Sequence, residues 1–346
     1  MFWLVDIFKF VFSLCIVGIH SWFLGGFKEW LYPVVFYSAV PYFFIASGFF
    51  FGKKYYSKGG YSEEIFKKFC KRLLTKLLLF EPISQIQVII LLALAGTALS
   101  TILIETVQHI LFYPFGGMWY IQALVVAGFL MLPFIKYGKE RYIIPVGMIL
   151  YLFTLICGRY HFVIEDITVL KNIVDNYLLY CISPKNGLFI GFLYMGLGVI
   201  AAKIWDAGSK SFRLKGINLM LLISALVFFT ELYLIRDYQG LINDSQYYLT
   251  QPFFVFSIFL FSAKYYEVPS AKPKHNTLIW RDLSISIYLL HAPVQRCFTL
   301  FEEITGIHTK LFGNPYSLFI LTILFTLLIC YPIYKRKTKY LYDWIV

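Results

Sequence analysis

The sequence predicts an all-α fold: a polytopic transmembrane helix bundle of about ten helices, with both termini in the cytoplasm. The 346 residues are 59% hydrophobic and only 14% charged, whereas an ordinary soluble domain is about 25% charged. The mean hydropathy is +0.70. Apolar windows long enough to cross the ~30 Å hydrocarbon core of a bilayer recur along the chain. We expect a single integral-membrane domain over residues 1–346.

Ten apolar windows define the predicted helices. No segment between them is long enough for a soluble domain, so any chemistry must be done by the membrane bundle. The first window carries Asp6 and Lys9 and lacks a small-residue cleavage site, so it is expected to be a retained helix and not a signal peptide. The windows are 3–24, 31–51, 73–95, 118–135, 142–157, 187–204, 214–235, 247–263, 283–300 and 316–334.

The placement of lysine and arginine predicts the orientation, because cytoplasmic loops carry an excess of both. Of the 31 basic residues, 23 fall in alternate segments and six in the segments between them. The net charge of +12 is therefore topological, and nucleic acid is not an expected partner. We expect a multi-pass protein of the cell membrane, plasma or inner. The basic segments are 52–76, 136–141, 203–215, 264–281 and 335–346.

The first predicted helix contains two ionisable residues, Lys9 and His20, within its apolar run. Eleven positions separate them, which is about three helical turns and roughly 16 Å of rise. Both side chains therefore lie on one helix face at two depths. Intramembrane ionisable residues usually mark functional sites, although Lys9 could snorkel to the interface and His20 could be satisfied by a neighbouring helix.

Two stretches near the predicted cytoplasmic surface could bind a polar ligand. Ser47-Gly48 ends the second window with a hydroxyl and a bare backbone, although a small-residue helix contact explains the pair equally well. From Ser62 the chain reads SEEIFKKFCKRLLTK, which predicts an N-capped basic amphipathic helix lying on the cytoplasmic face. That helix would attract anionic membrane lipid or the phosphates of a cytosolic ligand.

Further candidates lie at the other end of the predicted bundle. Trp119 and Tyr120 follow a Gly-Gly pair, where an aromatic belt is the simpler explanation. The ninth window carries Ser284, Tyr288 and His291 at helical spacing, followed by Arg296. These residues fit either a packed polar seam or a functional cavity. The outer loops 158–186 and 236–246 could form a lid or an acceptor platform.

No metal site is expected. The six cysteines are scattered without a C-x-x-C motif or a Cys/His cluster.

Taken in order, these stretches resemble the acyltransferase-3 family of integral-membrane acyltransferases. The family's first helix bears Arg, ten residues, then His, where this chain has Lys9 and His20. Its second helix ends like FFIASGF (43–49), its basic stretch like FCKRLLTKLLLF (69–80), and its Trp-aromatic step like Trp119-Tyr120. Its late Ser, Tyr, His, Pro pattern is approximated by Ser286, Tyr288, His291 and Pro293. The resemblance covers nearly the whole chain.

The resemblance implies a membrane O-acyltransferase, and we expect an O-acetyltransferase active in polysaccharide modification. It would move an acyl group from acetyl-CoA or another cytosolic acyl-CoA, its co-substrate, to a hydroxyl of a surface glycan or its lipid-linked precursor. The implied catalytic residues are His20, as general base or transient acyl carrier, and Lys9, which would orient the donor. The implied acyl-CoA-binding residues are Arg72, Lys76, Lys71, Ser47 and Gly48, and the implied acceptor side is Trp119, Tyr120, Tyr288 and His291.

Two departures from the family pattern matter. Lys9 replaces an arginine and cannot give the same bidentate grip, and Met118 stands where many members have His. In addition, NGLF (186–189) and NDSQYYL (243–249) resemble the membrane part of the serine racemases of vancomycin resistance, a branch associated with serine uptake. The alternative function is therefore a transporter domain for a small amino acid such as serine, without covalent chemistry.

Overall fold

The computed structural model describes residues 2–27, 30–57, 59, 62–207, 216–235, 246–266 and 277–336, without the side chains of 333, 334 and 336. These residues form α-helices and short 3-10 or π-helical turns, and no strand occurs among them. The helices are α1 (Trp3–Ser21), α2 (Ala39–Tyr56), α3 (Glu63–Leu94), α4 (Leu99–Phe112), α5 (Met118–Lys136), α6 (Ile143–Cys157), α7 (Thr168–Cys181), α8 (Phe192–Ala207), α9 (Ile217–Ile235), α10 (Gln251–Ala263), α11 (Leu278–Thr305), α12 (Lys310–Gly313) and α13 (Pro315–Arg336).

The predicted all-α class is confirmed, and each of the ten apolar windows contains a helix. Within the described residues, eight helical segments are long and apolar enough to cross a membrane: those of α1, α2, α3, α5, α6, α8, α9 and α13. The other two windows correspond to α10, which has only 13 residues, and to α11, which is long but charged. The cytoplasmic placement of both termini stays a prediction.

The centre of the bundle is the pairing of α2 with α8, and glycines let the two backbones touch. A methyl group added to Gly48 would overlap the Met195 carbonyl, and one added to Gly198 would overlap the Ile45 carbonyl. Around this pair, α1 packs against α11, α3 packs against α5 and α11, and α13 covers α11 from outside. Close glycine contacts of this kind hold helices together where apolar burial gives no advantage over lipid.

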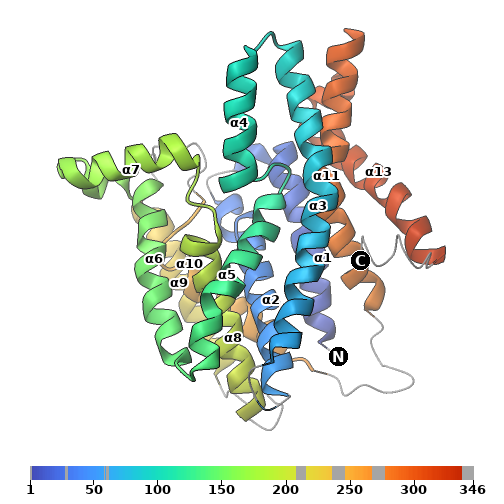
Figure 1. Cartoon of the computed structure of the whole chain (residues 1–346). Helices are drawn as coiled ribbons and strands as arrows, with labels where there is room; N and C mark the ends of the chain where they lie inside the picture. The colour runs from blue at the N-terminus through green and yellow to red at the C-terminus, as the bar shows by residue number, and fades with distance from the viewer. Residues whose placement is uncertain are drawn as a thin grey trace.

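The prediction of a surface helix before the third window was wrong. Ser62 caps the helix as expected, accepting a hydrogen bond from the Ile65 amide. However, the helix does not end before the third window but continues for 32 residues as one element. The apolar run 73–80 carries no helix breaker, so the basic turns simply extend the spanning helix, which runs along the bundle in Figure 1.

Three helices fall between the predicted windows: α4, α7 and the short α12. α4 follows α3 through a short turn, and the two form a hairpin beside the upper end of α11 (Figure 1). α7 lies within the loop 158–186 and runs across the direction of the spanning helices, at the same end of the bundle. The other outer loop, 236–246, lies outside the described residues except for Gln246.

Candidate functional site

His20 of α1 and His291 of α11 face each other where these two helices pack together. Their ring centroids are 5.1 Å apart. His291 is fully buried, whereas His20 is exposed. Nδ1 of His291 lies 2.7 Å from the Tyr288 carbonyl oxygen. Because a carbonyl oxygen can only accept, Nδ1 carries the proton, and Nε2, which has no partner among the described residues, keeps its lone pair.

Three of the predicted substrate-binding residues, Tyr288, Tyr120 and Ser47, extend from this pair as a row of hydroxyl-bearing side chains. The Tyr288 ring centroid is 6.0 Å from that of His291 and 5.4 Å from that of Tyr120. The hydroxyls of Tyr120 and Ser47 are hydrogen-bonded at 3.0 Å. Tyr288 donates to the carbonyl of Gly117. The structure therefore brings together His20, His291, Tyr288, Tyr120 and Ser47, which come from four different helices.

The segment 113–117 joins α4 to α5 and covers the site from one side. The Phe115 amide donates to Glu81 Oε1 at 3.2 Å, and the Phe115 ring stacks on His109 at 3.7 Å. Gly116 and Gly117 have positive φ angles of 65° and 84°, which favour glycine. The hydrogen bond to Glu81 thus holds this turn against α3, the hydrogen bond from Tyr288 holds it against α11, and the stack on His109 attaches it to the end of α4.

Polar residues on α3 belong to the same site, and the sequence analysis missed them. Glu81, Ser84, Gln85 and Gln87 are all buried. Gln85 donates to Glu81 at 2.8 Å, and Gln87 donates to the Pro293 carbonyl of α11 at 3.0 Å. The signal was present, since these four polar residues interrupt the third apolar window.

Lys185 is a second residue that the sequence analysis did not single out. It lies just before the π-helical turn Gly187–Gly191 that begins the α8 span. Its side chain is only 4% exposed and is within electrostatic range of His20. Burial lowers the pKa of the Lys185 ammonium to about 7.

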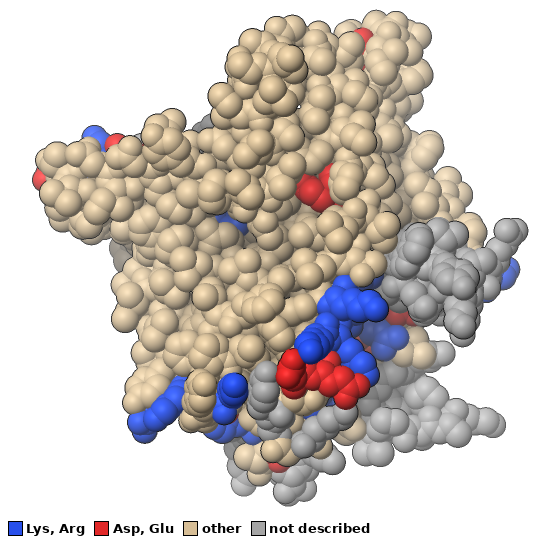
Figure 2. Space-filling view, in the orientation of Figure 1, with Lys and Arg blue, Asp and Glu red and all other residues tan. Residues whose placement is uncertain are grey.

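The predicted donor-binding cations lie toward the end of the bundle that carries the N-terminus. Lys9 Nζ is 5.7 Å from the Phe50 ring centroid and within electrostatic range of Asp6 and Arg72. Arg72 is exposed, whereas Lys76 is buried. Figure 2 shows the basic side chains gathered at this end, around the start of α3, while most of the remaining surface in view is uncharged.

Two predicted residues have clear packing roles. Gly48 lies against the backbone of Met195, as described above, so no ligand atom fits beside its Cα. Trp119 stacks on Tyr113 with ring centroids 5.8 Å apart. Lys71 is exposed on the outside of α3, where it lines a surface groove together with Lys67 and Phe129.

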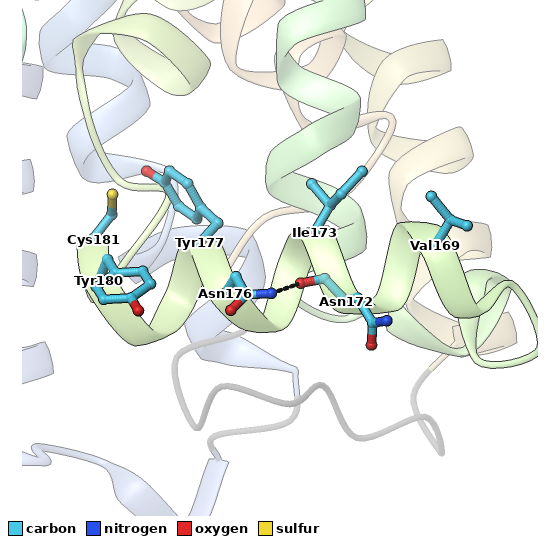
Figure 3. A pocket seen from close by; sticks show the side chains of 7 residues that line it. All are labelled: Val169, Asn172, Ile173, Asn176, Tyr177, Tyr180 and Cys181. Atoms are coloured by element: carbon cyan, nitrogen blue, oxygen red, sulfur yellow. Dashed lines mark hydrogen bonds between the residues drawn. The ribbon is translucent and has the colours of Figure 1, made fainter.

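An open hollow of about 590 Å³ runs along α7, away from these residues (Figure 3). All seven residues that line it belong to α7, from Val169 to Cys181. A hollow lined by one helix lacks convergent functional groups from several elements, which binding sites usually have. We therefore place the site at the histidine pair.

A model of the acyltransferase-3 family, described as an acyltransferase domain, matches residues 3–335. The chain belongs to this family. It is a multi-pass membrane acyltransferase that transfers groups other than aminoacyl groups. Neither a curated protein nor a solved structure gives a significant match. Across the described residues, no group of three or more His, Cys, Asp or Glu side chains could hold a metal ion.

Proposed function

We propose that this acyltransferase moves an acetyl or other acyl group from cytosolic acyl-CoA to a hydroxyl of a surface polysaccharide or its lipid-linked precursor. The observation that carries the proposal is the pairing of His20 on α1 with His291 on α11, whose ring centroids are 5.1 Å apart. An exposed imidazole beside a buried one with a free lone pair suits proton transfer or acyl transfer.

The donor would bind between the basic end and the histidines. The Lys9 ammonium would attract the phosphates of the donor as a point charge, and the Arg72 guanidinium would bind them through two parallel hydrogen bonds. Eleven residues of α1 separate Lys9 from His20, or about 16 Å along the axis. The pantetheine arm would lie along this distance, so that the thioester reaches the histidine pair. Ser47 and Tyr120, which lie between α2 and α5, would border its path.

The chemical step is a transfer between two nucleophiles. The acceptor hydroxyl oxygen forms a bond to the acyl carbon as the carbon–sulfur bond breaks, and the hydroxyl proton passes to His20 and then to the departing thiolate of CoA. If His20 carries the acyl group instead, its ring nitrogen attacks the acyl carbon and the carbon–sulfur bond breaks to release the CoA thiolate. The acceptor oxygen then attacks the same carbon, the carbon–nitrogen bond breaks, and the hydroxyl proton passes through the freed imidazole to the thiolate. In both versions His291 lies behind His20, with Nδ1 hydrogen-bonded to backbone and Nε2 available.

The test is glycan mass spectrometry on a deletion strain complemented with His20→Ala, His291→Gln or His308→Ala. His308 is an exposed histidine in the segment between α11 and α12 and serves as the matched control. We expect no glycan acylation with His20→Ala, at least a tenfold loss with His291→Gln, and wild-type acylation with His308→Ala. Wild-type acylation with His20→Ala would remove the catalytic role of this residue.

A further strain, complemented with His20→Gln, tests the transporter alternative. If the chain only moves a small amino acid such as serine, His20→Gln keeps a hydrogen-bonding group and should retain uptake of labelled serine, and uptake should not need an acyl donor. Orientation is tested separately: reporters within 52–76 and 203–215 should read as cytoplasmic, and a reporter within 158–186 as external. An external reading at 52–76 would place the donor cations on the wrong side for cytosolic acyl-CoA.

A further inference from the structure

A second polar cluster lies beside the histidine pair, where α3, α11 and the segment 113–117 meet. Glu81 and Ser84 reach it from α3, and Arg296 reaches it from α11. Ser84 is fully buried and Glu81 is 8% exposed. Arg296 and Gly116 are partly exposed, so the cluster borders open space and is not part of the closed core.

The cluster contains polar atoms that the protein itself does not satisfy. Glu81 Oε2, Ser84 Oγ and Arg296 Nη1 are buried atoms without a hydrogen-bond partner among the described residues. Glu81 uses only its other oxygen, which accepts from the Phe115 amide and from Gln85. Leaving buried polar atoms unpaired costs free energy, so each such atom calls for an explanation.

Gly116 shows where two of these atoms converge. A methyl group built on its Cα would lie 2.7 Å from Ser84 Oγ and 3.1 Å from Arg296 Nη1. Any other residue would therefore press against both groups. The next residue, Gly117, is approached in the same way by the Tyr288 hydroxyl, at 3.2 Å from its would-be Cβ. The two glycines therefore let the segment 113–117 approach α3 and α11 closely, and they link the cluster to the histidine side.

The mixture of charges selects one chemical class of ligand. An anion would meet the Glu81 carboxylate, and a cation would meet the Arg296 guanidinium. Neighbouring hydroxyls of an uncharged sugar suit both, because each hydroxyl donates to a carboxylate oxygen and accepts from a guanidinium. We propose that Glu81, Ser84 and Arg296, around Gly116, form an acceptor subsite that binds adjacent hydroxyls of a neutral sugar unit. The inference deepens the proposed function and rests on it for the reaction.

Binding is measured without any acyl donor, as the shift of the thermal midpoint of the purified protein with a neutral methyl glycoside, a uronate and an amino sugar. Ligands that bind the folded state raise this midpoint. We expect the neutral glycoside to bind most tightly. Glu81→Gln and Ser84→Ala should each raise its dissociation constant at least tenfold. The amide of Glu81→Gln still offers an oxygen to the Phe115 amide, and Ser84→Ala only removes an unpaired hydroxyl, so both variants should fold.

Glu303→Gln and Ser100→Ala are matched controls at exposed positions of α11 and α4 and should bind the glycoside like the wild type. Tighter binding of the uronate than of the neutral glycoside would overturn the proposal, since an anion site would then be present. An unchanged dissociation constant in both Glu81→Gln and Ser84→Ala would also overturn it. The assay needs no acyl donor, so it measures glycoside binding even if the proposed acyl transfer does not occur. Failure of the proposed function and failure of the subsite can therefore be distinguished.

Discussion

Gly48 is the predicted donor-binding residue whose role can be tested most sharply, because the structure gives it a different task. We consider its replacement by alanine. The added methyl would overlap the Met195 carbonyl and lie 2.8 Å from the Met195 carbonyl carbon. Both atoms belong to the backbone of α8, so no side-chain rotation can relieve the overlap. The two helices must separate, and the whole α2–α8 contact must adjust.

The expected cost follows from these distances. Carbon atoms in contact prefer about 3.5–4.0 Å, so α2 and α8 would have to move apart by roughly 1 Å or more. Overpacking a core costs about 1–3 kcal/mol and occasionally more, and the backbone overlap puts Gly48→Ala at about 3 kcal/mol. Gly52→Ala should cost about half as much, because its methyl would lie 2.9 Å from the Ala202 methyl carbon and 3.2 Å from the nearest backbone atom, Val199 Cα, which is a milder overlap. Gly26→Ala, with nothing within 4 Å, should stay within about 0.5 kcal/mol.

The assay is the thermal midpoint of each purified variant in one detergent, together with the KM for acyl-CoA. At ~3 kcal/mol the midpoint of Gly48→Ala should fall by roughly 4 °C, with Gly52→Ala intermediate and Gly26→Ala unchanged. A wild-type midpoint for Gly48→Ala would refute the packing argument. If the acyl-CoA KM rose in that same variant, Gly48 would contact the donor after all.

Three further predictions concern cations. Replacing Arg72 and Lys76 together by glutamine should raise the acyl-CoA KM at least tenfold, whereas Lys67→Gln, which removes only an exposed lysine paired with a glutamate one turn away, should not. Lys9→Arg should keep or increase activity because the fork restores the family's grip on phosphate; complete loss would show that Lys9 acts as a point charge. Lys185→Met should raise the thermal midpoint more at about pH 6 than at about pH 10. The pKa of Lys185 falls to about 7 on folding, so the buried lysine destabilises the fold fully below pH 7. This cost disappears as the pH rises toward the pKa of the unfolded state. An equal gain at both pH values would contradict the burial argument.

Much of the fold was predictable because a bilayer leaves few choices. Backbone polar groups must be satisfied within each spanning segment, so every long apolar window had to be a helix. The three helices that were not predicted, α4, α7 and α12, are short and lie between windows, where no such constraint acts. The basic turns before Leu73 were assigned to a separate surface helix because they are polar, yet a helix continues until something breaks it.

Contacts between helices were only partly predictable. The spacing of Lys9 and His20 placed both on one face of α1, but it could not say which helix that face meets. The role of Gly48 was left open between ligand binding and packing, since a bare backbone serves either purpose. Only the position of Met195 on α8, 147 residues further along the chain, favours packing.

One physical rule nevertheless connects the whole site. A polar side chain in a spanning helix faces the interior and pairs with others of its kind, so helices with polar faces are expected to meet. Applied to the first and ninth windows, the rule selected His20 and His291, whose rings lie 5.1 Å apart. Applied to the third window, it would also have selected Glu81 and Ser84, which lie on the helix that packs against α11. The three polar faces are therefore expected to converge. The polar residues in the first, third and ninth windows identify, from the sequence alone, the three helices α1, α3 and α11 that meet at the site.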